Sequence, residues 1–482
     1  MPSADRLRSR SDPGPWPAVA LAGALWPLVT AALRRARSSG HEILVSACAP
    51  VSGTVDPSAV IAGSRIAGEP WFCFEQPDRD ASALAALGTV VTLEASGPER
   101  FSVVDRGWQE LVSCALSTGG DGPGGTGLIA VGGFAFSPDG AAAPAWHGFA
   151  PASLIVPELT LVRRAERTWL TVNATVAPDD TAEDVLRRID TRLGSLRVGS
   201  LPLLDPAPTG RHEVSSPLAP AHFEAAVARA VERIRAGELE KIVLAREVEV
   251  RAPSPHEPAA VLGLLRDAFP SSYVFAVGRG DATFIGATPE LLIRREGQRA
   301  TTVALAGSTR RSADPAVDAH LGEALLRSDK DREENAIVAR RIARTLRPHA
   351  VWVTAASEPG LVSVANIQHL ARPIRAQLSA PLDAVQLTAL LHPTPAVGAE
   401  PSSRLDLIAA LEGFDRGWYA GPVGWIDAGG DGEFCVALRS ALLRDQVASC
   451  YAGCGIVADS DPAAELAESE LKLGVMLPAL TA

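Results

Sequence analysis

The sequence predicts an α+β protein in which antiparallel sheets are combined with helices. Between residues 42 and 201, short runs rich in β-branched and aromatic residues recur, and Gly, Pro or Asp residues separate them. Beyond residue 219, strand-like runs alternate with segments of helical periodicity. We find no internal repeat and no low-complexity tract. The interleaving of helices with mainly antiparallel strands therefore indicates the α+β class.

The N-terminal part begins with an apolar stretch, Pro17 to Leu33, that runs into the basic segment RRARSSG. A signal peptide and a membrane span are the alternatives to a helix here. The stretch contains Pro27, is short for a span and lacks a clear small-residue cleavage site, so we predict an N-terminal helix that ends at Gly40. The strand-like runs that follow are EILVSAC, PWFCFE, TVVTLEA, GLIAVGGFAF, SLIVPELTLVRR and TWLTVNATV.

A segment rich in Pro, Gly and Ser, residues 200–219, is the best candidate for an internal boundary. We accordingly divide the chain into a β-rich portion with a leading helix, residues 1–205, and a second portion, residues 206–482. In the second portion the sequence predicts a helix before Gly237, a strand starting at Lys241 and a long helical stretch ending at Pro348. It also predicts strands in GPVGWIDA and FCVALRSALL and a final helix from about Pro462.

Composition excludes several classes of protein. The chain is 47% hydrophobic and 21% charged, as expected of a globular protein. Its net charge of -11 and the lack of a long basic block argue against a nucleic-acid partner. Six cysteines without C-x-x-C spacing are typical of free thiols in a reducing cytoplasm. We expect a cytoplasmic protein that binds neither nucleic acid nor a membrane.

Glu334 continues an apolar helical stripe formed by Val338, Ile342 and Leu346. Burying a lone carboxylate is costly, so a metal or a paired base is implied if this stripe faces the core. The alternative is that Glu334 lies at the solvated end of the helix, among the residues DREEN. The sequence alone favours that alternative.

The C-terminal helix carries Glu465, Glu468 and Lys472 on one face. A solvated Glu468–Lys472 ion pair is the commonplace interpretation. The alternative is a site for Mg²⁺, which prefers carboxylate oxygens and often uses only one or two of them. In that case Glu334 and Glu468 form the ligand pair.

Two further residues have the chemistry of a general base and a general acid. Lys241 stands at the entrance to a strand, and Glu290 follows a Gly-Ala-Thr-Pro turn. Burial would make the lysine less basic and the glutamate less acidic, although the spacing alone favours a surface or ion-pair role for each of them. Arg439, together with the glycines of ALAGSTRR and YAGCGIV, is able to hold carboxylates.

These motifs, in this order, resemble the chorismate-utilising enzymes, the family of isochorismate, salicylate, anthranilate and aminodeoxychorismate synthases. The resemblance implies one fold of two stacked antiparallel sheets with helices outside and the active site between the sheets, so that both portions of the chain belong to it. The motifs that carry it are KIVLAR, FIGATPELL, ALAGSTRR, SDKDREEN, NIQHLARP, LHPTPAVG, FDRGWYAGPVGW, ALRSALL, YAGCGIV and AELAESELKLGVML.

The resemblance also assigns roles to residues of this chain. Lys241 matches the base that activates water for attack at C2 of chorismate, and Glu290 the acid that protonates the departing C4 hydroxyl. Glu334 and Glu468 match the Mg²⁺ ligands, with Glu465 at a neighbouring position that acts through water. Residues matched to substrate binding are Arg439, Tyr419, Lys472, Gly307, Ser308, the Gly453 to Gly455 loop, and His369, for which a structural role is the alternative.

Ala396, in the motif HPTPAVG, indicates the branch of the family. Members that eliminate pyruvate typically have threonine at this position, and isochorismate synthases have alanine. Lys241 points the same way, because the ammonia-using branch usually has glutamine there and needs an amidotransferase partner. Two departures from the family pattern are Asn335, where histidine is common, and Ala399, where a second glycine is common.

The sequence thus predicts a Mg²⁺-dependent isochorismate synthase that interconverts chorismate and isochorismate as a monomer or homodimer without an amidotransferase subunit. We expect it to supply menaquinone biosynthesis. The alternatives are supply of a siderophore pathway, a salicylate synthase that also acts as a lyase, and a non-catalytic chorismate-binding protein.

Overall fold

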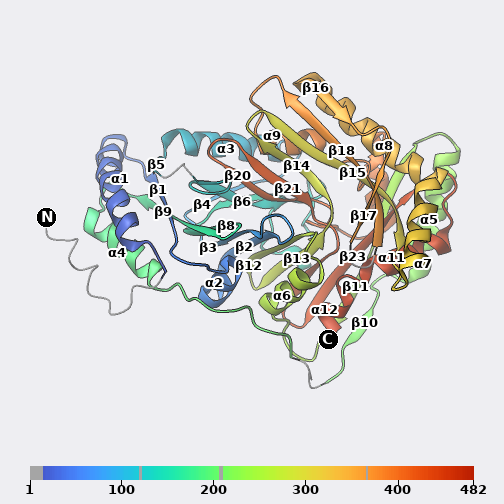
Figure 1. The fold of residues 1–482 in the computed structure, drawn as a ribbon, viewed down its shortest axis with the longest axis horizontal. Helices are drawn as coiled ribbons and strands as arrows, with labels where there is room; N and C mark the ends of the chain where they lie inside the picture. Colours follow the sequence, from blue (N-terminus) through green and yellow to red (C-terminus); the bar gives the residue numbers. More distant parts are fainter. Residues whose placement is uncertain (1–14, 119–121, 206–209, 365–366, 482) are drawn as a thin grey trace.

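The computed structural model describes residues 15–118, 122–205, 210–364 and 367–481. Within them the strands form two large sheets, with helices on the outside (Figure 1). The expected division of the chain falls between Asp205 and residues 206–209, and the latter lie outside the described residues. Strands from both sides of this point enter both sheets.

The first sheet has the strand order β10-β11-β23-β22-β13-β12-β2-β3-β8-β9-β1-β5, with β19 paired to β11. Neighbouring strands are antiparallel throughout except for the β1–β5 pair. Its strands are β1 (Ile43–Pro50), β2 (Gly68–Gln76), β3 (Ser82–Leu87), β5 (Leu116–Thr118), β8 (Leu159–Arg164), β9 (Arg167–Val176), β10 (Glu213–Ser215), β11 (Lys241–Arg251), β12 (Tyr273–Gly280), β13 (Ala282–Thr288), β19 (Ala399–Glu400), β22 (Ser440–Arg444) and β23 (Val447–Ile456).

The second sheet is antiparallel, with the order β16-β18-β15-β14-β21-β20-β6-β7-β4 and β17 paired to β18. Its strands are β4 (Val91–Ala95), β6 (Ile129–Phe134), β7 (Ala152–Val156), β14 (Leu291–Glu296), β15 (Arg299–Arg310), β16 (Ala350–Ala355), β17 (Gly360–Ser363), β18 (Ile367–Leu378), β20 (Pro422–Asp427) and β21 (Gly432–Val436).

The largest apolar core joins the two sheets. Buried side chains of the first sheet, such as Phe72 and Leu84, belong to the same cluster as Phe134 and Phe434 of the second. A second core includes buried residues of the first sheet together with those of the flanking helices α1, α2, α4, α6 and α12. The predicted α+β architecture of stacked antiparallel sheets with outer helices is therefore confirmed.

The described helices lie on the outside of the two sheets (Figure 1). They are α1 (Ala18–Ser39), α2 (Pro57–Ser64), α3 (Arg100–Cys114), α4 (Ala182–Leu193), α5 (Pro220–Arg235), α6 (Pro258–Ala268), α7 (Pro315–Arg327), α8 (Asp329–Leu346), α9 (Ala384–Leu391), α10 (Asp406–Glu412), α11 (Pro462–Leu473) and α12 (Leu477–Thr481).

Helix α1 is the predicted N-terminal helix. Gly40 ends it in the left-handed conformation, with φ of 75°. Among the described residues it is the one helix long and apolar enough to cross a membrane. One of its faces is buried in the second core, through side chains that include Leu21, Leu25 and Val29. This packing is that of a helix at the edge of a folded protein.

Several sequence predictions of helices and strands needed correction. The long helical stretch predicted before Pro348 is two helices, because Ser328 ends α7 and caps α8, where its hydroxyl accepts a hydrogen bond from the Asp331 N–H at 3.3 Å. The run SLIVPELTLVRR forms two strands, β7 and β8, and the run FCVALRSALL also forms two, β21 and β22; in each case the two strands lie in different sheets. The break between β21 and β22 contains Arg439 in the left-handed region, with φ of 49°, so the chain crosses between sheets beside the predicted site.

Candidate active site

A pocket lies between the two sheets and receives nearly all of the residues predicted from the sequence. Its walls come from β11 and β23 of the first sheet, β15 and β18 of the second, and helices α8 and α11. Twelve of the fourteen predicted site residues line it: Glu290, Gly307, Ser308, Glu334, His369, Ala396, Tyr419, Arg439, Gly453, Gly455, Glu468 and Lys472. The other two, Lys241 and Glu465, are buried beside it through contacts described below.

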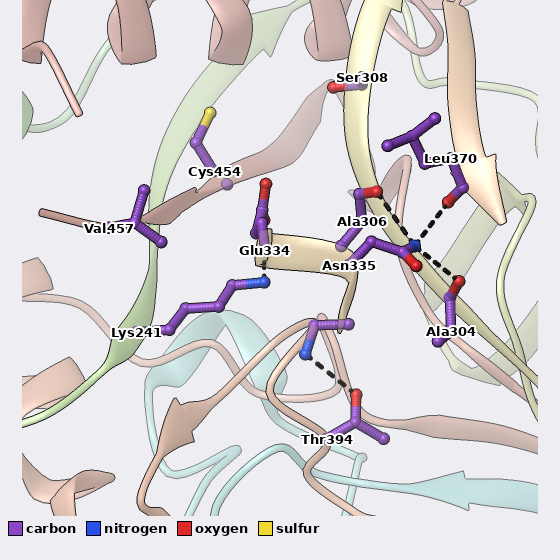
Figure 2. Close-up of polar contacts among 12 residues, drawn as sticks. Lys241, Ala304, Ala306, Ser308, Glu334, Asn335, Leu370, Thr394, Cys454 and Val457 are labelled. Atoms are coloured by element: carbon purple, nitrogen blue, oxygen red, sulfur yellow. Dashed lines mark hydrogen bonds and ion pairs between the residues drawn. The ribbon is translucent and has the colours of Figure 1, made fainter. Parts of the chain in front are cut away.

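Lys241 is the first residue of β11, and its side chain is fully buried. Its Nζ lies 2.8 Å from Oε1 of Glu334, which projects from α8 (Figure 2). Gly455 on β23 leaves room for this pair, because a Cβ there would lie 2.1 Å from Glu334 Oε1 and 2.9 Å from Lys241 Cε. The second glycine of YAGCGIV is thus required by the close approach of two charged side chains.

Glu290 lies in the turn between β13 and β14 and is buried. Burial raises the pKa of its carboxyl to about 7, although the nearby cations Lys241, Arg439 and Lys472 lower it in part. A carboxyl group with this pKa is substantially protonated near neutral pH. Glu290 can therefore donate a proton to a group bound in the pocket.

His369 and Arg439 form a polar wall. The Arg439 Nη2 lies 3.3 Å from the His369 Nε2, and arginine can only donate, so Nε2 is the acceptor. Burial, followed by the charges of Arg439 and Lys472, lowers the pKa of His369 well below its usual value. Burial also raises the pKa of Tyr419 to about 12. A neutral histidine, a protonated tyrosine and a cationic arginine therefore face the pocket.

Glu468 and Lys472 form the ion pair predicted on α11, at 2.7 Å, but Lys472 is largely buried. The Ser308 hydroxyl donates to Glu468 Oε1 at 2.9 Å, and Lys472 Nζ donates to the Gly453 carbonyl at 2.8 Å. Burial raises the pKa of Glu468, but Lys472 and Ser308 outweigh it and bring the pKa to about 2. Glu468 is therefore a carboxylate at physiological pH.

The neighbouring acidic groups suit a hard cation. Ligand atoms of Glu465, Glu468 and Cys454 lie within 4.8 Å of one another. Burial raises the pKa of the Cys454 thiol well above its usual value, and the thiol donates to the Glu465 carbonyl at 3.2 Å. The sulfur is thus a protonated donor, which leaves carboxylate oxygens as the available ligands. Oxygen donors of this kind fit Mg²⁺.

The family follows from comparison with known proteins. Residues 31–481 match the model of a family described as chorismate binding enzyme. The chain belongs to this family. A salicylate biosynthesis isochorismate synthase from Pseudomonas aeruginosa is 38% identical, over 94% of this chain and 93% of the relative. The isochorismate synthase MenF of Bacillus subtilis is 32% identical, over 93% of this chain and 96% of the relative.

Solved structures of chorismate-binding enzymes are similar along most of the chain. The menaquinone-specific isochorismate synthase MenF of Escherichia coli has a TM-score of 0.75 and 26% identity, and the match covers 94% of this chain and 99% of that one. A DhbC from Bacillus anthracis, described as a 2,3-dihydroxybenzoate-specific isochorismate synthase, has a TM-score of 0.69 and 28% identity, over 88% and 99%. These likenesses agree with the two-sheet fold.

Asn335, one of the two departures from the family pattern, turns away from the predicted metal site (Figure 2). Its Nδ2 is within hydrogen-bond distance of the carbonyls of Ala304, Ala306 and Leu370, at 3.0–3.3 Å. Its Oδ1 accepts from Arg372 at 2.9 Å. Asn335 therefore fixes α8 against β15 and β18 and so places Glu334, the preceding residue. Ala399, the other departure, is a buried residue of β19 paired with Ile242.

Arg416 lines the pocket but was not predicted from the sequence. It forms a buried ion pair with Glu412 and donates to the carbonyls of Val397 at 2.8 Å and Val243 at 2.9 Å. One guanidinium group thus joins the loop that carries Ala396 to the strand that begins at Lys241. The two carbonyl partners lie 19 and 173 residues away in the sequence, so the motif FDRGWYAG alone does not indicate this role.

Proposed function

We propose that this chain is an isochorismate synthase that interconverts chorismate and isochorismate. Relatives with that name match nearly the whole chain. The observation that carries the proposal is the combination in one site of buried Lys241 and of Glu290 with a pKa of about 7. A base and a protonated acid are what the exchange of hydroxyl groups on a ring requires.

The proposed reaction adds water at C2 and removes the hydroxyl group at C4. Lys241, acting as the neutral amine, takes a proton from the attacking water as the oxygen bonds to C2, and the double bonds of the ring shift. Glu290 gives its proton to the C4 oxygen, which leaves as water. The 2.8 Å contact with Glu334 and the close packing against Gly455 hold the Lys241 side chain in place for this step.

In the proposal Mg²⁺ is held by Glu334 and Glu468, with Glu465 acting through water. When bound, the cation neutralises negative charge on the substrate and orients it. Chorismate carries two carboxylates, and Arg439, Tyr419, Lys472 and the backbone around Gly307 and Gly453 are the donors proposed to bind them. His369 accepts from Arg439 and so orients its guanidinium group.

We further propose that the protein is cytoplasmic and that it acts as a monomer or homodimer without an amidotransferase subunit. Relatives named for menaquinone and for salicylate biosynthesis both match nearly the whole chain. We retain menaquinone supply as the proposed use of the product. Disruption of the gene, followed by measurement of menaquinone and salicylate, tests that use separately from the reaction.

The reaction itself is tested by incubating the purified protein with chorismate, with and without Mg²⁺ and with and without ammonium. We expect Mg²⁺-dependent isochorismate in equilibrium with chorismate, and little pyruvate, on chromatographic separation. Salicylate plus pyruvate as main products would support the salicylate synthase alternative instead. An ammonium-dependent amino product would contradict the assignment of Lys241 as a water-activating base.

Replacing Ala396 by threonine should raise the ratio of pyruvate to isochorismate. The added hydroxyl reaches into the pocket that Ala396 lines and can hydrogen-bond the substrate during elimination. One such bond, at about 1.4 kcal/mol, corresponds to about a tenfold change. Pyruvate is measured with a coupled lactate dehydrogenase assay. The matched control is Ala396→Val, which has the shape of threonine without its hydroxyl, and an equal rise in that variant would contradict the prediction.

A further inference from the structure

The chain contains only three lysines, against 42 arginines, and all three are at the candidate site. Lys241 pairs with Glu334, Lys472 with Glu468 and Lys330 with Glu465, at 2.7–2.9 Å. Each predicted metal-binding carboxylate therefore has its own ammonium partner. The proposed function accounts for Lys241 and Lys472 but gives no role to Lys330.

Lys330 lies in the first turn of α8, four residues before Glu334 and on the same face of the helix. Its Nζ donates to Oε1 of Glu465 on α11 at 2.9 Å. Burial lowers the pKa of Lys330, but Glu465, Glu334 and Glu468 outweigh it and raise the pKa. The Lys330 side chain is 37% exposed, whereas Lys241 is fully buried, so Lys330 reaches the carboxylates from the solvent side.

A lysine differs from an arginine in ways that matter at this position. Its ammonium is a compact charge on a flexible stem, whereas a guanidinium group binds a carboxylate bidentately in a fixed plane. A cation that binds Glu465 must compete with Lys330 for its carboxylate. A single ammonium contact with water access can be exchanged for another cation, and a bidentate contact is exchanged less readily.

We propose that Lys330 is an internal counter-ion that sets the affinity of the carboxylate cluster for a divalent cation. It neutralises Glu465 and joins α8 to α11 through this contact. When the cation binds, Lys330 releases the Glu465 carboxylate to it. This inference rests on the metal site of the proposed function. It extends that site to a residue that takes no part in the proposed chemistry on the ring.

The test is Mg²⁺ binding to the full chain without chorismate, measured by isothermal titration calorimetry. Lys330→Met removes the charge while keeping an unbranched side chain, and we expect Mg²⁺ to bind about tenfold more tightly. Lys330→Arg keeps the charge and adds a bidentate contact, so we expect several-fold weaker binding. A purely structural lysine would not produce changes of opposite sign.

The matched control is Arg327→Met, which removes a positive charge from the exposed Arg327–Glu323 pair at the end of α7. Mg²⁺ affinity should not change in this variant. The proposal is overturned if Lys330→Met binds Mg²⁺ no more tightly than the natural chain, or if Arg327→Met produces the same gain. Absence of Mg²⁺ binding in the natural chain would instead contradict the metal site of the proposed function.

A second measurement guards against a folding effect. In EDTA, Lys330→Met should have a lower Tm than the natural chain, because Glu465 loses its partner. Saturating Mg²⁺ should remove this difference by binding the folded state. A Tm deficit that persists in saturating Mg²⁺ would show that Lys330 serves the packing of α8 and not the cation.

Discussion

Replacing Lys241 by methionine should lower kcat by about a thousandfold, since a positioned general base contributes roughly 10²–10⁴ in rate. The side chain is fully buried and its amine contacts one carboxylate, Glu334. Methionine keeps the length and apolar stem of lysine but has no basic atom. Turnover of chorismate is measured by chromatography at saturating Mg²⁺.

Loss of activity could also follow from an unpaired buried Glu334, which costs about 3–5 kcal/mol when a buried partner is removed. The double variant Lys241→Met/Glu334→Gln removes this cost, so its free energy of unfolding should recover relative to that of Lys241→Met. Lys241→Ala offers a second control, because added propylamine can occupy the space and supply a base. Activity near that of the natural chain in Lys241→Met, or no rescue by the amine, would contradict the role.

The helical stripe shows how far sequence reasoning could go. The stripe of Glu334, Val338, Ile342 and Leu346 is buried, as its apolar members indicate. The sequence alone favoured a solvated position for Glu334 at the end of the helix, and this prediction was wrong. Residue spacing shows which face of a helix a side chain occupies, but it does not show how deeply the first turn of the helix is buried. That depth depends on β11 and β23, which bring Lys241 and Gly455 against the carboxylate.

The Glu468–Lys472 pair also shows that spacing does not give the burial of a side chain. The pair itself was predicted from the i, i+4 spacing, but its setting was not. Lys472 is drawn inward by the Gly453 carbonyl, a contact that depends on how α11 packs on β23. Arg416 and Lys330 were not predicted for the same reason, since their decisive contacts other than Glu412 lie 19 to 173 residues away in the sequence.

The break at Arg439 illustrates a different limit. The run FCVALRSALL has continuous strand character, and nothing in its composition signals a change of sheet. The chain leaves β21 and enters β22 through a left-handed arginine, a strained conformation for a residue with a side chain. Packing of two sheets around a site imposes this conformation, so it becomes visible only in the assembled fold.

Replacing Glu290 by glutamine should abolish most turnover, by about 10²–10⁴ in kcat, while stabilising the protein. The natural carboxyl has a pKa of about 7 because it is buried, and the rate should therefore fall as pH rises through 7 and the acid loses its proton. This alkaline limb of the pH–rate profile should be missing from the residual activity of Glu290→Gln. Rates measured between pH 5.5 and 9 test both expectations.

The stability effect has a definite sign. A carboxyl whose folded pKa is raised contributes its stability at low pH and loses it as pH rises through the folded value. From a usual value of 4.5 to about 7, the cost of Glu290 at pH 8 reaches about 3 kcal/mol, which a neutral glutamine of the same shape avoids. Glu290→Gln should thus have a higher Tm than the natural chain at pH 8 and a similar Tm at pH 4.5. A variant that is inactive because it is misfolded would have a lower Tm than the natural chain at pH 8. A higher Tm together with a loss of turnover would therefore identify Glu290 as a catalytic acid whose burial lowers the free energy of unfolding.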